Sequence, residues 1–148
     1  MIKLVKSLLL FTALLICSGL IIAEPSLSKP LRKYQIKGLF TIVKHYDHER
    51  FLTTEGENSF CFGSGGMDDL KSYAPVTITD EQGKILAMGE LGRGREDSEG
   101  CTMSFTVENI PKSNFYSVEV ARRGKVTYSF DRMIESRWRV GLSVGEKY

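Results

Sequence analysis

The feature that most constrains this chain is an alternation of apolar and polar residues with a period of two. It is clearest in the segment CTMSFTVE at 101–108, where every second side chain is apolar. Successive side chains of a β-strand point to opposite faces, so this pattern is typical of a strand with one buried face. Similar alternation predicts further strands at 34–44, 115–121, 125–130 and 137–144.

The residues between these segments favour short turns. The sequence DEQG at 80–83 separates PVTIT from KILAMGEL, as in a β-hairpin, and Arg123-Gly124 separates two further strands. Helical periodicity is weak, apart from a single turn predicted at 131–136. Short strands at spacings of roughly ten residues, without strand–helix alternation, predict an all-β fold. We expect an antiparallel β-sandwich of about seven to eight strands.

The N-terminal segment has the composition of a secretory signal peptide. Two lysines precede the apolar run LLLFTALLICSGLIIA at 8–23, and Glu24-Pro25 end it. Ala23 is small enough for the residue before the cleavage point. We therefore predict a signal peptide at 1–23, a linker at 24–33 and one domain at 34–148, in a secreted, periplasmic or otherwise extracytoplasmic protein.

Two alternatives to cleavage after Ala23 stay open. Cys17 could be lipid-modified, although Ile16 is larger than the small residue that normally precedes such a cysteine. The apolar run could also remain as an anchor, but as a helix it would span about 24 Å, less than the roughly 30 Å of a bilayer core. We expect no stable membrane span once the signal peptide is removed.

The charge of the mature chain argues against nucleic acid as a partner. Lys3 and Lys6 lie in the predicted signal peptide, so 18 of the 20 basic residues remain, and they equal the 18 acidic residues. Nucleic-acid affinity depends on neutralising many phosphates, which a chain without excess positive charge does poorly. A protein or a glycan at the cell surface is the more suitable partner.

Two cysteines remain after the signal peptide, Cys61 and Cys101. An even pair in an oxidising compartment predicts one disulfide. It would close a loop of about 41 residues, for which chain entropy gives roughly 4 kcal/mol of stabilisation. A metal site is less favoured, because the close C-x-x-C spacing of sulfur sites is missing.

The strand pattern resembles that of small secreted bacterial domains of prealbumin-like or immunoglobulin-like type. The shared scheme is V-x-V-x-D-x-x-G-K, a glycine-rich turn, F-x-V, a proline, and Y-x-V-x-V, over roughly residues 36–144. The resemblance implies a sandwich fold and export, and it implies no activity. A histidine and arginine signature of transthyretin-type enzymes finds no match. The residues that carry the scheme are Val76, Ile78, Asp80, Gly83, Lys84, Phe105, Val107, Pro111, Tyr116, Val118 and Val120.

The glycine-rich segment FCFGSGGMDDL at 60–70 invites several interpretations. A phosphate-binding loop would need a lysine after the last glycine, and here Asp68 and Asp69 would repel a phosphate. A nucleophile elbow around Ser64 lacks the first glycine of its motif and a recognisable histidine. We favour a corner in which the glycines adopt positive φ and the aspartates cap the turn.

Calcium is the alternative ligand for this region. A disulfide would bring the loops at 63–70 and 92–100 to one end of the domain, and both loops contain carboxylates, which calcium prefers. The candidate ligands are Asp68, Asp69, Glu96 and Asp97. The D-x-D-x-D-G pattern is absent, so we expect no cofactor and retain calcium as an alternative.

Three further groups of residues are candidates for binding. His45 and His48 have the H-x-x-H spacing of a metal pair, but we favour a solvated polar turn at 45–49. Arg123, Lys125, Arg137 and Arg139 would form a polyanion patch if the fold gathered them, and a solvated outer face is the simpler interpretation. The aromatic residues Phe105, Tyr116, Tyr128, Phe130 and Trp138 are expected to pack in the core rather than line a cavity.

These observations favour a secreted, non-catalytic binding or accessory module. Its loops at 63–70 and 92–100 would be the recognition elements, because loops on a rigid frame commonly bind partners. A calcium- or metal-dependent binding module is the second hypothesis, and a small hydrolase is the third. The ligand and the oligomeric state are left open by the sequence.

Overall fold

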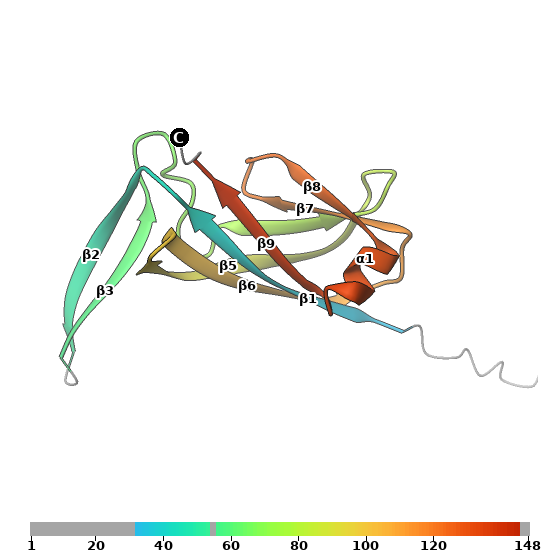
Figure 1. The fold of residues 1–148 in the computed structure, drawn as a ribbon, viewed down its shortest axis with the longest axis horizontal. Coiled ribbons are helices and arrows are strands. Elements are labelled where there is room, and N and C mark those ends of the chain that lie inside the picture. Colours follow the sequence, from blue (N-terminus) through green and yellow to red (C-terminus); the bar gives the residue numbers. More distant parts are fainter. Residues whose placement is uncertain (1–31, 54–55, 146–148) are drawn as a thin grey trace, which may run out of the picture. The chain divides into compact units, whose positions relative to one another are not determined.

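The computed structural model describes residues 32–53 and 56–145, with side chains described outside 51–57. The predicted signal peptide at 1–23 and most of the predicted linker at 24–33 therefore lie outside the described residues. Within them the chain forms nine strands and one short helix (Figure 1). In chain order these are β1 (Tyr34–Ile42), β2 (Tyr46–Thr53), β3 (Gly56–Gly63), β4 (Pro75–Thr79), β5 (Ile85–Asp97), β6 (Gly100–Ile110), β7 (Phe115–Val120), β8 (Lys125–Ser129), α1 (Phe130–Glu135) and β9 (Arg139–Val144).

The strands belong to one hydrogen-bonded sheet. Its main path is β8-β7-β4-β5-β6-β1-β9, and the β2–β3 hairpin joins it where Cys61 of β3 pairs with Gly94 of β5. Every pair is antiparallel except β1 and β9, which run parallel. The prediction of a wholly antiparallel arrangement is therefore wrong at this pair. Parallel neighbours need a crossover between them, and the chain enters β9 from α1, after crossing from the far edge at β8.

The long strand β5 joins the two halves of the sheet. Its first part pairs with β4 and its second part with β6, with a shift of register between Leu91 and Gly94. Such an irregularity bends a strand and increases its twist. The prediction of an all-β fold with one disulfide is confirmed. A sandwich of two separate sheets is not, because β5 runs through both halves and the sheet has near-barrel curvature.

Two segments that were expected to be irregular are strands. The polar turn predicted at 45–49 is wrong, because β2 begins at Tyr46 and pairs with β3 along its length. The loop predicted at 92–100 is also wrong: β5 continues to Asp97 and β6 begins at Gly100. Side chains at both sites are largely exposed, so no apolar alternation reveals these strands in the sequence.

The core lies between the facing sides of β1, β6, β4 and β7. Gly38 on β1 has no side chain, and the ring of Phe105 on β6 fills the space that a Cβ would need. This explains why a glycine interrupts the apolar face of the first strand. The most buried core side chains are those of Ile36, Ile42, Leu70, Val76, Ile78, Leu91, Met103, Val107, Ile110, Tyr116, Val118 and Met133.

Aromatic side chains close the end of the sheet beside α1. The ring of Trp138 stacks on Tyr34 at 4.3 Å between centroids and meets Tyr116 edge-on at 5.4 Å. Phe130, the first residue of α1, packs against the rings of Tyr34 and Tyr116. The prediction that the aromatic residues pack in the core is therefore confirmed for this group, with Tyr128, Phe130 and Trp138 partly buried at its margin.

The buried Tyr116 also fixes the connection that precedes its strand. Its hydroxyl oxygen accepts a hydrogen bond from the backbone N–H of Ser113 at 2.8 Å, and the hydroxyl donates to Pro111 O at 3.4 Å. Burial of the ring raises the pKa of the phenol above its usual value. A tyrosine that bonds to backbone a few residues upstream is typical of the corners of sandwich domains.

Candidate functional site

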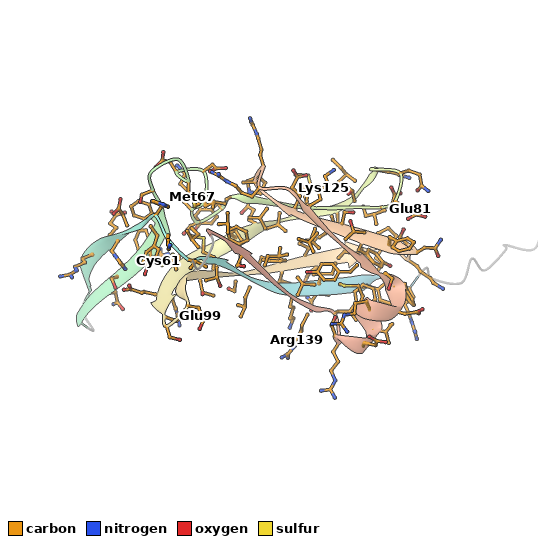
Figure 2. The ribbon with its side chains drawn as sticks, turned by 45° about the horizontal axis from the view of Figure 1, so that its top comes forward. Cys61, Met67, Glu81, Glu99, Lys125 and Arg139 are labelled. Atoms are coloured by element: carbon orange, nitrogen blue, oxygen red, sulfur yellow. A yellow bond between two sulfur atoms is a disulfide. The ribbon has the colours of Figure 1, made fainter. Side chains whose placement is uncertain are left out.

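The predicted disulfide is present and joins β3 to β6 (Figure 2). Cys61 and Cys101 are both buried, with their Cα atoms 5.8 Å apart. Gly94 lies against this bridge, and a Cβ there would overlap the carbonyl oxygen of Cys61 and approach Cys101 Sγ to 2.8 Å. The disulfide therefore fits only because β5 presents a glycine at the crossing.

The glycine-rich segment after Cys61 turns a corner, as predicted. Gly65 and Gly66 have φ values of 56° and 93°, which side chains rarely adopt. The turn is closed by the backbone N–H of Gly63, which donates to Leu70 O at 2.7 Å, and Leu70 is fully buried. The backbone N–H of Ser64 donates to the carbonyl oxygen of His45. The contact between these two residues is therefore a main-chain hydrogen bond that holds the turn.

Three of the four predicted calcium ligands contact different partners within the chain. Asp69 pairs with Arg123, Asp97 accepts backbone hydrogen bonds from Glu99 and Gly100, and Asp68 is exposed. No cluster of three or more metal-ligating side chains occurs within 32–53 and 56–145 where side chains are described. Calcium binding stays a prediction that no observed geometry favours.

Glu96, Tyr46 and His48 form a small polar group at the start of β2. Glu96 accepts from Tyr46 Oη at 3.0 Å, and its other oxygen lies 2.8 Å from His48 Nε2. The hydrogen bond to Glu96 raises the pKa of the Tyr46 phenol. His45 precedes β2 in a left-handed conformation with φ of 61°, whereas His48 is part of that strand. Only His48 reaches the carboxylate, and the contact links the β2–β3 hairpin to the end of β5.

The four basic residues predicted to form a polyanion patch do not gather. Arg123 is hydrogen-bonded to Gly66 O and Asp69, and Lys125 lies 3.8 Å from Glu119. Arg137 and Arg139 lie at the α1 end of β9, while Arg123 borders the cleft together with residues 141–144 of that strand. Figure 2 shows Arg139 well separated from Lys125. A single patch of these four residues is therefore not formed.

Arg139 instead borders a shallow groove on the outer face of β6, β1 and β9. Lys37 on β1 is paired in register with Arg139 on β9. Leu39, which is paired with Gly141, is 53% exposed. The groove has a volume of about 470 Å³ and also contacts Ser104 and Thr106. It presents two cations, two hydroxyl groups and one exposed aliphatic side chain to solvent.

A second hollow lies between the two ends of the sheet. β8 pairs only with β7 and β9 only with β1 among the described strands, so each has a second edge without a strand neighbour. These edges border a cleft of about 280 Å³. Its apolar lining comes from four strands and consists of Phe40, Val118, Val120, Val126, Leu142 and Val144.

One buried polar atom of a residue that borders this cleft lacks a partner. Arg123 lines the cleft beside Gly124, and its Nη2 atom makes the bonds to Gly66 and Asp69. Its Nε atom is buried and has no hydrogen-bond acceptor in the part of the chain that the structure describes. A buried donor without an acceptor is costly, and because the chain covers this atom it is not a contact point for a ligand in the cleft.

Sequence reasoning placed the cleft residues in ordinary strands and missed the cleft. Val126 and Leu142 were assigned to apolar strand faces, which is their local role, but their position at the sheet ends depends on strand order. The available signal was the segment VGLSV at 140–144, which has no charge or proline to protect an edge. No known family model matches this chain, and neither a curated protein nor a solved structure matches it.

Proposed function

We propose that the protein is a non-catalytic binding module whose recognition surface is the cleft between β8 and β9. The observation that carries this proposal is the combination of an apolar lining, two described strand edges without strand neighbours, and the polar residues Arg123 and Ser143 at the cleft. Binding sites are typically apolar hollows with a few placed polar groups, and the cleft has that composition.

We also propose that the module works outside the cytoplasm. The Cys61–Cys101 disulfide supports this, because such bonds persist in oxidising compartments. Within the described residues, no helix has both the length and the apolar composition to cross a bilayer. The resemblance to secreted prealbumin-like or immunoglobulin-like domains remains part of the proposal, and the corner made by Tyr116 supports it.

The outer groove beside Lys37 and Arg139 supports a second candidate function, binding of an anionic glycan. Two cations in register on neighbouring strands would attract sulfate or carboxylate groups, and the attraction would weaken with salt. The groove is shallow, however, and its polar groups are solvated. We therefore place the β8–β9 cleft first.

A screen that assumes no particular ligand tests the proposal. We would record amide spectra of isotope-labelled protein with a library of small amides, carboxylates and short peptides. We expect shifts that cluster at Val126, Leu142 and Val144. Shifts that cluster at Lys37 and Arg139 would favour the glycan candidate, and an absence of shifts at the cleft would contradict the proposed function.

Two matched variants test whether the amide shifts come from compounds bound in the cleft. Val126→Glu places a charge at the cleft, and Leu39→Glu makes the same kind of change on the outer face of β1. Both side chains are exposed, at 44% and 53%, so both variants should fold. We expect only Val126→Glu to remove the shifts seen with the wild-type protein.

A further inference from the structure

The parallel pairing of β1 and β9 brings two basic segments of the chain side by side (Figure 1). Lys37 on β1 pairs in register with Arg139 on β9, and the backbone N–H of Lys37 donates to Trp138 O at 3.0 Å. Both cations are exposed, whereas the next residue of each strand is buried. The two side chains therefore project from the same outer face of the sheet, where like charges on neighbouring strands repel each other.

Three more exposed cations lie at the starts of the same two strands. Arg32 and Lys33 directly precede β1, and Arg137 lies two residues before β9. The ring of Trp138 stacks on Tyr34, which holds the two strand starts together. These five exposed cations are called the basic face, which consists of Arg32, Lys33, Lys37, Arg137 and Arg139.

The basic face forms no ion pair with an acidic side chain of the described residues. Glu108 on β6 lies on the same side of the sheet and accepts a hydrogen bond from Gln35 at 2.6 Å. On α1, Glu135 pairs with Arg132, and Asp131 is exposed without an ion pair to the basic face. A bound anion would thus reduce the repulsion between the cations without displacing an internal partner.

The outer groove offers contacts for a ligand larger than a single ion. Besides the paired cations, its lining includes Leu39 and the hydroxyl groups of Ser104 and Thr106. These hydroxyl groups can donate and accept hydrogen bonds. Gly141 has no atom within 4 Å of the position of a Cβ, so the groove is open there. The volume of about 470 Å³ is within the roughly 300–1,000 Å³ of known ligand sites.

We propose that the groove and the basic face bind a polysaccharide that bears carboxylate or sulfate groups, with one anionic group between Lys37 and Arg139 and a sugar ring over the hollow at Gly141. This inference rests on the second candidate function and assigns its contacts. A guanidinium holds a carboxylate by charge-assisted hydrogen bonds. A chain suits the site better than a flat bilayer does, because a flat surface would leave the floor of the groove without contact.

Matched polysaccharides test the proposal on the full chain. The anionic probes are dextran sulfate and polygalacturonate, as short chains of uniform length. Their controls are uncharged dextran and methyl-esterified polygalacturonate, which keep the sugars and lack the charge. In calorimetry we expect only the anionic chains to bind. Raising the salt from about 0.1 M to about 1 M should weaken binding at least about tenfold, because the Debye length falls from about 10 Å to about 3 Å.

Two double variants with the same change of charge separate a local site from net charge. Lys37→Glu with Arg139→Glu should abolish binding. Lys71→Glu with Lys84→Glu changes two exposed lysines that do not line the groove, and it should weaken binding by less than about fivefold.

A third variant tests the hollow without a change of charge. Gly141→Val fills the open space and should weaken binding at least about fivefold, because a side chain there would clash with a bound ring. Circular dichroism and thermal melting of every variant verify its fold.

The contradicting outcomes are distinct. Equal losses in the two double variants would show attraction to net charge and no local site. Wild-type binding by Gly141→Val would exclude a ring in the hollow. If vesicles of phosphatidylglycerol bind through Lys37 and Arg139 while the polysaccharides do not, the ligand is a lipid surface and the proposal is wrong. If none of the probes binds, the second candidate function fails as well. None of these measurements involves Val126 or Leu142, so the function proposed for the β8–β9 cleft stands or falls separately.

Discussion

The corner around the Cys61–Cys101 disulfide and the opening between β8 and β9 differ in how closely backbone is packed. At the corner, a Cβ on Gly63, Gly94 or Gly100 would overlap a backbone carbonyl oxygen of another residue. At the opening, the chain leaves a cleft of about 280 Å³ between β8 and β9. The corner is a closed junction, and the opening has space that the chain itself leaves unfilled. This difference is the physical basis for placing recognition at the opening.

Removing the disulfide should have the largest effect on stability. We expect Cys61→Ala with Cys101→Ala to lower the free energy of unfolding by roughly 4 kcal/mol, because the loop closed by the bridge gains entropy when the chain unfolds. Denaturant titration without reductant measures this change. A loss below about 1 kcal/mol would show that the corner is held by packing rather than by the bridge.

Adding one methyl group at the corner should be the next largest change. Gly94→Ala would press a Cβ against the Cys61 carbonyl and should cost about 1–3 kcal/mol, as overpacking does elsewhere. Gly141→Ala is the matched control on an edge strand, and we expect a change within about 0.5 kcal/mol. Thermal unfolding of both variants provides the comparison, and equal losses would remove the distinction between the two regions.

The aromatic group packs at the α1 end of the core. Tyr116→Phe keeps the buried ring but leaves the backbone N–H of Ser113 without its acceptor. We expect a loss of about 1 kcal/mol, measured by denaturant titration. A neutral result would mean that ring packing alone fixes this end of the core.

The same residue predicts a dependence on alkaline pH. Burial raises the pKa of Tyr116 in the folded state, so the neutral phenol is favoured there. The stability that the buried phenol contributes is fully present below the unfolded-state pKa near 10. It is lost as the pH rises from that pKa through the higher pKa of the folded state. The wild-type protein should therefore lose stability more steeply than Tyr116→Phe above about pH 10. Parallel slopes for the two proteins would contradict this.

Substitution of the exposed cleft residue should have the smallest effect. Val126→Thr retains a β-branched shape on β8, and we expect the free energy of unfolding to change by less than about 0.5 kcal/mol. Thermal unfolding checks this expectation. A large loss would show that Val126 belongs to the core and that the cleft is closed in solution.

Much of the strand pattern could be predicted from the sequence, for a specific reason. β6 and β7 bury one face, so Met103, Phe105 and Val118 alternate with more exposed residues and reveal the period of two. β2 has no such contrast: its described residues are mostly exposed, and only its pairing with β3 makes it a strand. The disulfide followed from counting cysteines, which needs no knowledge of the fold.

The candidate site could not be predicted, because it depends on strand order. Arg123 was assigned to a solvated patch, yet its partner Asp69 lies 54 residues earlier in the chain. Leu142 and Val126 have the local pattern of strand residues, and only the topology places them at the two ends of the sheet. Local periodicity specifies which side of a strand is buried, but not which strands lack a neighbour.

Amide hydrogen exchange along β9 tests the central claim most directly. In the free protein we expect the amides of Gly141–Val144 that face the cleft to exchange quickly, while the amide of Gly94 beside the disulfide exchanges slowly. Saturation with a library compound that shifts the cleft residues should slow these β9 amides. If the β9 amides are already slow in the free protein, or stay fast when such a compound is bound, the account of an open recognition cleft between β8 and β9 is wrong.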